Sequence, residues 1–577
     1  MGNENVNEKT FTFDAPRYSL SVKGHLVSVI VENNVLAVLD VRTAVPQTNE
    51  TDDGFLPDPE PDAPVLTKAE IGPAGAEFVW EGKSALWGKK YVLTADKLRF
   101  RYTVTVQGRG RADAVKYFLG RGFGSGYEFS EGFTPCVSWY NNEDYHFRAS
   151  EKCHRWSVLM VPPMFCYSFR TERIGTRLGF GLVAEKGEHN FNSFDYKAVR
   201  NGFESGFFFE TDQSGHVSVD GSWTAPAIIG YVGDSDEDIC RRYSEYYFLT
   251  GIAELPRRKD RPRFWYGPMV CGWIEQMIAS DNAAADKSGI PNHSDDFANE
   301  KLYDALAEKI KKYDLHPTAL IIDDKWAEHY AAGEADQTKF PDMRAYVERR
   351  RKEGIRTLLW FKLWDRDGWD DSLCIENDRG EKYIDPSTEE YKALVRERMH
   401  LYLSDDEGCY NCDGFKLDFA FIIPMGRKVR ARSGKYGVEL LYEMMKDIYD
   451  AAKAVKPDAL INCSPCHPYF ASICDQARLH DYDPCNRDNR ADLGQRAKMF
   501  SLAMPGVLLD TDNAGFISRR DTIHWLMDQP LIGVPDLYTL SSSAGAPFCD
   551  SDIIGLSQLW KEYGEMADRM YGKDEIK

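Results

Sequence analysis

Two charged residues lie inside an apolar run in the second half of the chain. The run is GFKLDFAFIIP at 414–424, and its charges are Lys416 and Asp418. Burying a charge is costly unless the site uses it. On a strand, residues two apart project to the same side, so the Lys416 ammonium would hold the Asp418 carboxylate ionised. An ionised carboxylate in that position can act as a nucleophile.

More charged and aromatic residues end the other strand-like segments of this region. Besides Lys416 and Asp418 they include Asp323, Asp324, Trp326, Trp360, Arg478, Asp481, Asp483 and Asp512. Carboxylates accept hydrogen bonds from hydroxyl groups, and aromatic rings cover the apolar C–H face of a sugar. The set therefore predicts a carbohydrate site. Hydrolysis of a glycosidic bond also needs two carboxyl groups that flank the bond.

The second carboxyl group must be protonated to release the leaving group, and poor solvation raises a carboxyl pKa toward the working pH. Asp481 is the predicted acid, and Asp483 is the reserve. Asp323 is expected to contact the sugar rather than Asp324, because adjacent residues of a strand face opposite ways. Arg478 either contacts the sugar or neutralises the acids in a buried ion-pair network.

Eight apolar, strand-like segments alternate with helical segments after residue 262. The strand candidates are FWYGPMVCGW, TALIIDDKW, RTLLWFKLWD, GFKLDFA, DALINCSPC, CDQARLHDYD, GVLLDTDN and PLIGVPDLYTL. Helical stretches include ANEKLYDALAEKIKKY, STEEYKALVRERMHLYL and VELLYEMMKDIYDAAKAV. This alternation and the length of the region predict a (β/α)8 TIM barrel over 262–577, whose active site lies at the C-terminal strand ends.

The first part of the chain has a different residue pattern. Residues 10–233 contain short, alternating β-runs such as HLVSVIVENNVLAVLDV and KYVLTADKLRFRYTVTVQG, which predict an antiparallel β-sandwich over 1–235. The segment 236–250, DEDICRRYSEYYFLT, is helical in pattern, and a charged, Pro-containing stretch follows it. We therefore place a helical linker at 236–261.

Composition excludes several classes of function. The 577 residues carry 91 acidic and 71 basic side chains for a net charge of −20, which disfavours nucleic acid as a partner. The sequence has no run near the roughly 18 to 20 apolar residues that a membrane helix needs. The polar N-terminus, MGNENVNEKTF, resembles no signal peptide. A cytoplasmic protein is expected, with secretion or a periplasmic location open if a leader was removed.

The cysteine and histidine pattern does not favour a metal site. The 13 Cys fit reduced thiols better than a disulfide framework. Cys409/Cys412 and Cys463/Cys466 have the spacing of zinc ligands, but they flank opposite ends of predicted strands. His467 has no second ligand at a suitable spacing and is expected at the rim of the pocket. We expect no metal and no organic cofactor.

The quoted segments resemble glycoside hydrolase family 31. GFKLDFAFIIP resembles its nucleophile segment, LIIDDKW and GIRTLLWFKLW its second and third strands, and MPGVLLDTDNAGFISRRDTIHWL the segment after its acid/base. The run NDRGEKYIDPSTEEYKALVRERM is similar to the approach to the nucleophile strand. The separation of 63 positions from Asp418 to Asp481 also matches the family and its relative, family 36; the place of Arg478 is more like that in families 27 and 36.

The resemblance implies a role for each matching residue. Asp418 would be the nucleophile and Asp481 the acid/base, while Asp323, Lys416 and Arg478 would contact the sugar. Trp326, Trp360 and Asp512 are further sugar contacts implied in the same way, and we add Asp324 and Asp483 as neighbours of these groups. The expected activity is that of a retaining α-glycosidase acting by double displacement on an α-glucoside or α-galactoside.

Two alternatives stay open. The same residues would serve a transglycosidase, in which a sugar rather than water resolves the intermediate. A non-catalytic carbohydrate-binding barrel is the other alternative, because Ala420 and Phe421 follow the nucleophile position and RLHD precedes and includes the acid position, where the family usually has other residues. A homo-oligomer is also open.

Overall fold

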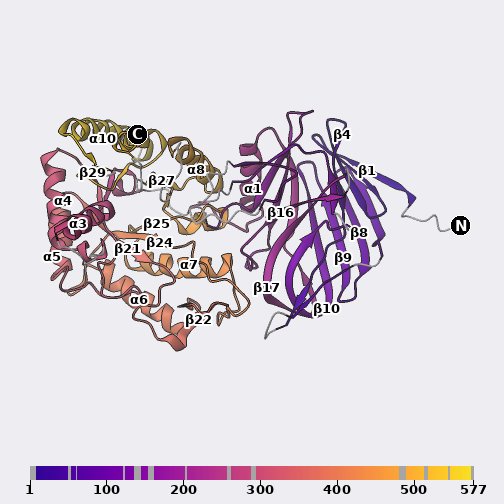
Figure 1. The fold of residues 1–577 in the computed structure, drawn as a ribbon, viewed down its shortest axis with the longest axis horizontal. Coiled ribbons are helices and arrows are strands. Elements are labelled where there is room, and N and C mark those ends of the chain that lie inside the picture. The colour runs from indigo at the N-terminus through magenta and orange to yellow at the C-terminus, as the bar shows by residue number, and fades with distance from the viewer. Residues whose placement is uncertain are drawn as a thin grey trace, which may run out of the picture.

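The computed structural model divides into an antiparallel β-domain and a barrel of strands and helices (Figure 1). It describes residues 8–49, 54–59, 62–120, 124–135, 145–153, 161–201, 204–256, 261–286, 294–479, 489–512, 518–543 and 546–572. The helices α1, α7 and α8 lie toward the junction of the two parts (Figure 1). The fold class expected from the sequence is confirmed.

The β-domain consists of strands that are all hydrogen-bonded into one sheet. Two long strands dominate it, because β10 pairs with β17 in antiparallel register from Thr105–Thr224 to Tyr117–Phe209. The strands are β1 Thr10–Asp14, β2 Ser19–Lys23, β3 Leu26–Val31, β4 Asn34–Asp40, β5 Gln47–Thr48, β6 Phe55–Leu56, β7 Val65–Gly72, β8 Gly75–Lys83, β9 Gly88–Ala95, β10 Arg99–Tyr117, β11 Ser125–Tyr127, β12 Glu131–Phe133, β13 His146–Arg148, β14 Cys166–Arg170, β15 Arg177–Val183, β16 Asp195–Asn201, β17 Glu204–Thr224 and β18 Ala227–Gly233.

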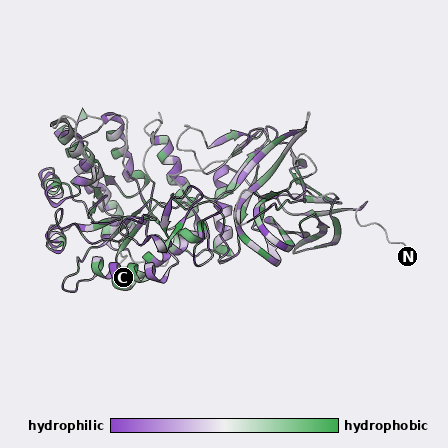
Figure 2. Ribbon diagram, turned by 60° about the horizontal axis from the view of Figure 1, so that its bottom comes forward, coloured by the Kyte–Doolittle hydropathy of each residue, from purple (hydrophilic) through white to green (hydrophobic). Residues whose placement is uncertain are grey.

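Aromatic side chains fill the interior of the β-domain. Hydrophobic and hydrophilic residues alternate along its strands (Figure 2), as expected when one face of a sheet is buried. Phe169 stacks on Phe129 with ring centroids 4.6 Å apart, and Phe207 and Phe209 are fully buried beside them. These contacts pack aromatic residues from separate strands of the β-domain into one core.

The barrel is built from eight parallel strands in the order β27-β26-β25-β24-β21-β20-β19-β28. A parallel bridge between Asp510 and Val534 joins the two ends of this order, so the sheet closes. The strands are β19 Met269–Cys271, β20 Ala319–Ile322, β21 Arg356–Lys362, β24 Gly414–Asp418, β25 Leu460–Cys463, β26 Gln476–Arg478, β27 Leu508–Asp510 and β28 Asp536–Leu537.

Helices surround the barrel strands, and side-chain caps fix the starts of several of them. Asn299, Thr388 and Ser518 each accept a hydrogen bond from a backbone N–H of the first turn of the helix that follows, which compensates donors left open at a helix start. The α-helices are α1 Asp236–Leu249, α2 Arg263–Tyr266, α3 Trp273–Asp286, α4 Glu300–Lys312, α5 Met343–Lys352, α6 Glu389–Leu403, α7 Val438–Val455, α8 Asn489–Ala503, α9 Arg519–Ile532 and α10 Asp550–Tyr571.

Short elements complete the barrel. They are the 3₁₀ turns η2 Ser294–Phe297, η3 Asp371–Leu373 and η4 Pro468–Ile473, the hairpin β22 Cys374–Glu376 with β23 Lys382–Ile384, and the hairpin β29 Ser542–Ser543 with β30 Ala546–Pro547. Among the described residues, no helix is both long and apolar enough to span a membrane.

All eight predicted strand segments contain a barrel strand, and the four predicted helical stretches contain α1, α4, α6 and α7. Two of these segments extend into helices. The first begins at Phe264 inside α2 and ends at Trp273, where α3 begins. The last strand was expected to begin near Pro530, but Pro530 lies inside α9 and β28 begins only at Asp536. The domain limits at 235 and 262 stay predictions, since α1 packs on both β-strands and barrel elements.

His467 lies in the junction between the two parts, and its expected place at the pocket rim is wrong. Its side chain is fully buried, with Nε2 3.0 Å from the Tyr243 hydroxyl of α1 and Nδ1 accepting from the backbone N–H of Tyr469 at 3.2 Å. Burial is the main cause that lowers the pKa of His467 well below its usual value. The imidazole is therefore neutral in the folded protein.

The buried His467 predicts a loss of stability in acid. The unfolded chain takes up a proton below the usual histidine pKa of about 6.5, whereas the folded chain does not. The contribution of His467 is thus fully present above about pH 6.5 and falls by up to about 1.4 kcal/mol per pH unit below it. We expect His467→Gln to unfold at a lower temperature than the wild type at pH 7.5 but to lose less stability between pH 6.5 and 5.

Thermal unfolding from pH 7.5 to 5 tests this expectation, with His316→Gln as the control, because His316 is exposed. Parallel pH profiles for His467→Gln and the wild type would contradict the prediction.

Candidate active site

Charged residues from four barrel strands meet at one rim. Asp323 follows β20, Lys416 and Asp418 lie at the end of β24, Arg478 ends β26, and Asp512 follows β27. All these strands are parallel, so their C-terminal ends lie at the same end of the barrel, where barrels of this type carry their active sites.

Asp418 is the most accessible carboxylate in this group. Its side chain is 15% exposed, against 1% for Arg478 and Asp512 and 3% for Asp323. Arg478 Nη2 donates to Asp418 Oδ1 at 2.7 Å, and Trp360 Nε1 donates to Oδ2 at 3.1 Å. The backbone N–H of Phe419 also donates to Oδ1, at 2.8 Å. These donors compensate the negative charge and fix the orientation of the carboxylate.

The cation that contacts Asp418 is not the one expected. Lys416 Nζ forms its salt bridge with Asp323 Oδ2 at 2.8 Å, whereas Arg478 forms the salt bridge with Asp418. The expectation that Lys416 is the main partner of Asp418 is therefore wrong. The reason is that the long Lys416 side chain reaches from β24 to the end of β20, which lies beyond β21 in the sheet.

The Lys416–Asp323 pair is deeply buried. Burial disfavours the ammonium, but the attraction of Asp323 and then of Cys271 outweighs it and raises the pKa of Lys416 well above its usual value. Cys271 Sγ lies 3.0 Å from Asp323 Oδ2, and Tyr303 Oη accepts from the Asp323 N–H at 2.7 Å. The pair is thus charged and held in place.

Arg478 joins two carboxylates at once. Its Nη1 donates to Asp512 Oδ2 at 2.8 Å while Nη2 contacts Asp418. A planar guanidinium suits this task, because its N–H groups point in fixed directions. Asp512 is thereby placed beside the nucleophile candidate. Its role as a direct sugar contact stays a prediction.

The two tryptophans predicted as sugar contacts occupy successive positions behind Asp418. Trp360 contacts Asp418 directly, and Trp326 Nε1 donates to the Trp360 carbonyl at 2.8 Å. Trp326 is only 3% exposed and packs edge-on against Tyr402. Asp324 points to Tyr330, whose hydroxyl donates to Asp324 Oδ1 at 2.8 Å. The structure thus brings Trp360 to the carboxylate, with Trp326 supporting its backbone.

The predicted acid and its reserve, Asp481 and Asp483, lie outside the described residues. Their roles stay predictions.

Two buried carboxyl groups near this rim are absent from the predicted site residues. Burial, followed by the charge of Asp512, raises the pKa of Asp510 to about 6. Burial and then the charges of Asp510 and Asp512 raise the pKa of Asp536 well above its usual value. Neither oxygen of Asp536 has a hydrogen-bond partner within the described part of the chain. The sequence signal for Asp536 was its place in the eighth strand segment, PDLYTL.

Four strand ends of the rim carry a non-glycine residue in the left-handed backbone region. They are Lys325, Trp364, Phe419 and Asp512, with φ between 51° and 73°. Such conformations cost about 1–3 kcal/mol each and persist only where the surroundings enforce them. At Phe419 the consequence is direct, because this residue follows Asp418 and its N–H donates to that carboxylate.

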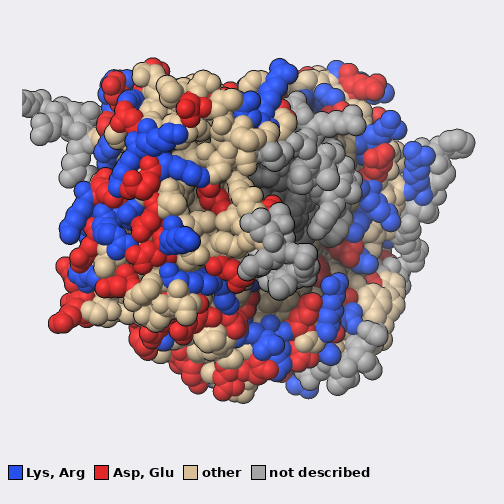
Figure 3. All heavy atoms as spheres, turned by 60° about the vertical axis from the view of Figure 1, so that its left-hand side comes forward, with Lys and Arg blue, Asp and Glu red and all other residues tan. Residues whose placement is uncertain are grey.

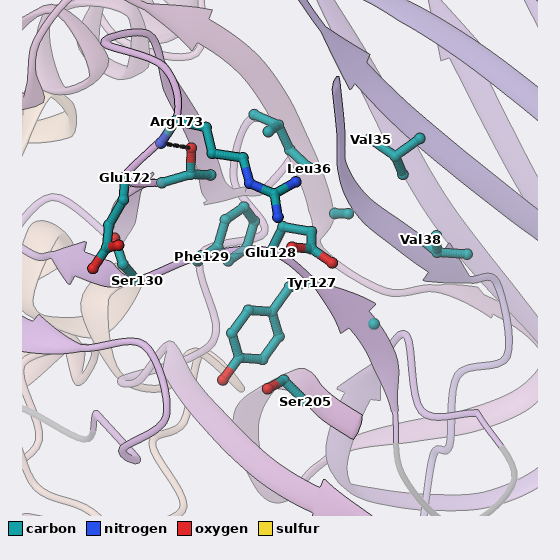
Figure 4. Close-up of a pocket in the computed structure, with 13 residues that line it drawn as sticks. Val35, Leu36, Val38, Tyr127, Glu128, Phe129, Ser130, Glu172, Arg173 and Ser205 are labelled. Carbon is teal, nitrogen blue, oxygen red and sulfur yellow. Dashed lines mark hydrogen bonds between the residues drawn. The ribbon is translucent and has the colours of Figure 1, made fainter. Parts of the chain in front are cut away.

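A large cavity lies away from this rim, in the β-domain. It has a volume of about 650 Å³ and is lined by β-domain residues such as Leu36, Tyr127, Glu128 and Arg173 (Figure 4). None of the charged residues of the barrel rim contributes to its lining. Size alone therefore does not identify the reacting centre, and we assign the candidate site from the converging carboxylates.

Acidic and basic side chains are interspersed over the barrel end of the molecule (Figure 3). Within the described residues, no group of three or more His, Cys, Asp or Glu is arranged to hold a metal ion. Cys412 precedes β24 and Cys463 ends β25, so the two CxxC pairs lie toward opposite ends of parallel strands, as the sequence predicted.

The arrangement supplies one partly exposed carboxylate with three donors and a neighbouring buried Lys–Asp pair. A fixed carboxylate of this kind can attack an electrophilic carbon or accept a proton. The surrounding N–H groups, carboxylates and the Lys416 ammonium can bind hydroxyl groups.

Comparison with family models and with curated proteins finds no match. Solved structures do match over nearly the whole chain. A GH31 family sulfoquinovosidase from E. rectale, in complex with an aza-sugar inhibitor, has a TM-score of 0.60 at 11% identity, covering 98% of this chain and 83% of that one. A variant GH36 α-galactosidase from Geobacillus stearothermophilus, in complex with raffinose, has a TM-score of 0.56 at 11% identity, with 98% and 87% covered.

The galactosidase domain of an α-galactosidase–sucrose kinase has a TM-score of 0.53 at 11% identity, covering 97% of this chain and 86% of that one. At these identities the likeness establishes the fold. The chain therefore shares with these proteins a (β/α)8 barrel preceded by an antiparallel β-domain.

The buried Lys416–Asp323 pair predicts a large change in stability. Lys416→Met leaves the Asp323 charge buried without its cation, so we expect a loss of about 3–5 kcal/mol in the free energy of unfolding. Lys416→Met combined with Asp323→Asn removes both charges and should be more stable than the sum of the single changes implies. Urea unfolding of the three variants measures the coupling.

Lys446→Met is the control, because Lys446 pairs with Asp450 on the exposed face of α7 and such pairs contribute about 1 kcal/mol or less. Strictly additive effects of the Lys416 and Asp323 changes would contradict the coupling.

Proposed function

We propose that the protein is a retaining α-glycosidase of the family 31 type, acting on α-linked glycosides by double displacement. The observation that carries the proposal is the environment of Asp418. This carboxylate lies at the C-terminal end of a barrel strand, is more exposed than Asp323 and Asp512, and is oriented by Arg478 and Trp360. The fold shared with the family 31 and family 36 structures supports the same assignment.

In the first step, Asp418 attacks the anomeric carbon of the sugar and forms a covalent glycosyl-enzyme. One Asp418 oxygen forms the new bond while the glycosidic oxygen leaves. The loss of carboxylate charge weakens the salt bridge to Arg478, which then remains paired with Asp512. Arg478 thus keeps one anionic partner throughout the reaction.

The leaving oxygen needs a proton, and Asp481 is proposed to give it, with Asp483 as the reserve. In the second step the same carboxylate takes a proton from water, which attacks the anomeric carbon and releases Asp418. Retaining enzymes place the two carboxyl groups about 5–5.5 Å apart, and we expect that separation between Asp418 and Asp481.

Asp323, Lys416, Arg478 and Asp512 are proposed to bind the hydroxyl groups of the sugar beside the cleaved bond. The buried Lys416–Asp323 pair offers both a donor and an acceptor at a fixed position, which suits adjacent hydroxyl groups. Asp324, Trp326, Trp360 and Asp483 would complete the pocket. An α-glucoside or an α-galactoside is the proposed substrate class, and transfer to a second sugar is the alternative fate of the intermediate.

Asp418→Asn tests the nucleophile. We expect the wild type to release nitrophenol from at least one aryl α-glycoside among the glucoside, galactoside, xyloside, N-acetylgalactosaminide and sulfoquinovoside. The variant should lose at least about 10³-fold in kcat, because an amide cannot form the glycosyl ester. Asp220→Asn, at an exposed β-domain ion pair, is the matched control. Retained turnover in Asp418→Asn would exclude this residue as the nucleophile.

A trapped intermediate tests the reaction course. A 5-fluoro-glycosyl fluoride of the sugar that is turned over should label the wild type with one sugar, and peptide mass spectrometry should place the label on Asp418. Proton NMR should show that the first product keeps the α configuration. A β product, or a label on another residue, would be incompatible with the proposed double displacement.

A further inference from the structure

A second cavity lies where the β-domain meets the barrel. Its volume is about 320 Å³, and its lining includes Arg101, Glu185, Glu188, Gln213, His216 and Trp223. This volume lies at the lower end of the roughly 300–1,000 Å³ typical of small-molecule sites. The lining residues all come from the β-domain, so the cavity is separate from the carboxylates of the barrel rim.

An amide without a partner belongs to a residue of the cavity lining. Gln213 is only 1% exposed, and its Nε2 has no hydrogen-bond partner within the described residues. Buried polar groups are almost always paired in native proteins, and each exception calls for an explanation. A ligand that brings an acceptor into the cavity would satisfy the Gln213 amide.

An aromatic ring lies on the same strand. Trp223 belongs to β17, as Gln213 does, and is partly buried against the core while it lines the cavity. An indole ring offers an apolar face and one N–H donor. This combination fits the C–H face and hydroxyl groups of a sugar ring.

The charges of the lining disfavour an anion. Arg101 and Glu185 form an ion pair with each other, and Glu188 forms no ion pair with any described residue. Burial is the main cause that lowers the pKa of His216 to about 4, so this imidazole is neutral. The lining itself therefore carries one net negative charge, which disfavours phosphate, sulfonate or carboxylate groups, and the Arg430 guanidinium outside the lining lies 3.0 Å from His216 Nδ1.

We propose that this cavity is a second binding site, which takes a neutral saccharide unit. The Trp223 ring covers one face of the sugar, the Gln213 amide donates to a ring or hydroxyl oxygen, and Glu188 accepts from a hydroxyl. The lining residues of the cavity are the basis for proposing the site. The statement that the saccharide belongs to the glycan substrate rests on the proposed function.

Two residues of the cavity also hold the segment that follows the nucleophile strand. His216 Nε2 lies 2.9 Å from the Gly426 carbonyl, and its ring stacks on Tyr436 at 3.7 Å. Asn190 Oδ1, which lines the same cavity, accepts from the Tyr436 N–H at 2.7 Å. The cavity thus borders a segment at the active-site end of the barrel, where a longer glycan would extend.

The test is saccharide binding by the full chain carrying Asp418→Asn, which prevents turnover. Saturation-transfer NMR and calorimetry are applied with glucose, galactose, maltotriose and raffinose, and glucuronate serves as the anionic probe. We expect at least one neutral saccharide to bind at a site that Trp223→Ala and Gln213→Leu each weaken at least tenfold. Gln558→Leu, an exposed amide of α10, should leave this binding unchanged.

Gln213→Leu removes an amide that has no described partner for its Nε2, so it provides a variant expected to fold if Trp223→Ala does not. Equal binding by the parent and both cavity variants, preference for glucuronate, or no binding of any neutral saccharide would overturn the proposal. Aryl-glycoside turnover, measured on the protein with Asp418 intact and on its Trp223 and Gln213 variants, separates the two proposals. Saccharide binding that depends on Trp223 without any turnover would refute the glycosidase alone, whereas turnover without such binding would refute the second site alone.

Discussion

The contact of Arg478 with two carboxylates is the interaction on which the arrangement of the rim depends. Asp418 and Asp512 come from different strands, and their charges would repel each other without the guanidinium between them. Arg478 itself is 1% exposed, so water contributes little to offsetting the repulsion between these two carboxylates. Because Lys416 is engaged with Asp323, Arg478 is the cation that Asp418 and Asp512 share. The result is one carboxylate, Asp418, that is both oriented and accessible.

Much of the fold was predictable because the barrel strands are short apolar runs between helices of clear periodicity. The run at 414–424 contains β24, and VELLYEMMKDIYDAAKAV coincides with α7. The last strand was harder, since β28 has two residues and follows a helix that contains Pro530. A proline normally favours a helix end, and packing of α9 against α8 and α10 overrides that preference here.

The residues of the site were predictable from the sequence, but the salt bridges between them were less so. Polar residues at strand ends pointed to Asp323, Lys416, Asp418, Arg478 and Asp512, because parallel strands bring these ends together. Which cation meets which acid depends on side-chain reach across the barrel, and a linear pattern does not contain that information. The same reason explains the misplaced His467, whose surroundings are created by the docking of α1 on η4.

Residues of the β-domain hold the segment that follows β24. Asp113 pairs with Arg427 at 2.9 Å, and His216 and Asn190 hold Gly426 and Tyr436. The two halves of the chain are therefore not interchangeable parts. A barrel joined to a different β-domain would lose the anchors of this segment, so the two parts of the chain must change together wherever these contacts lie.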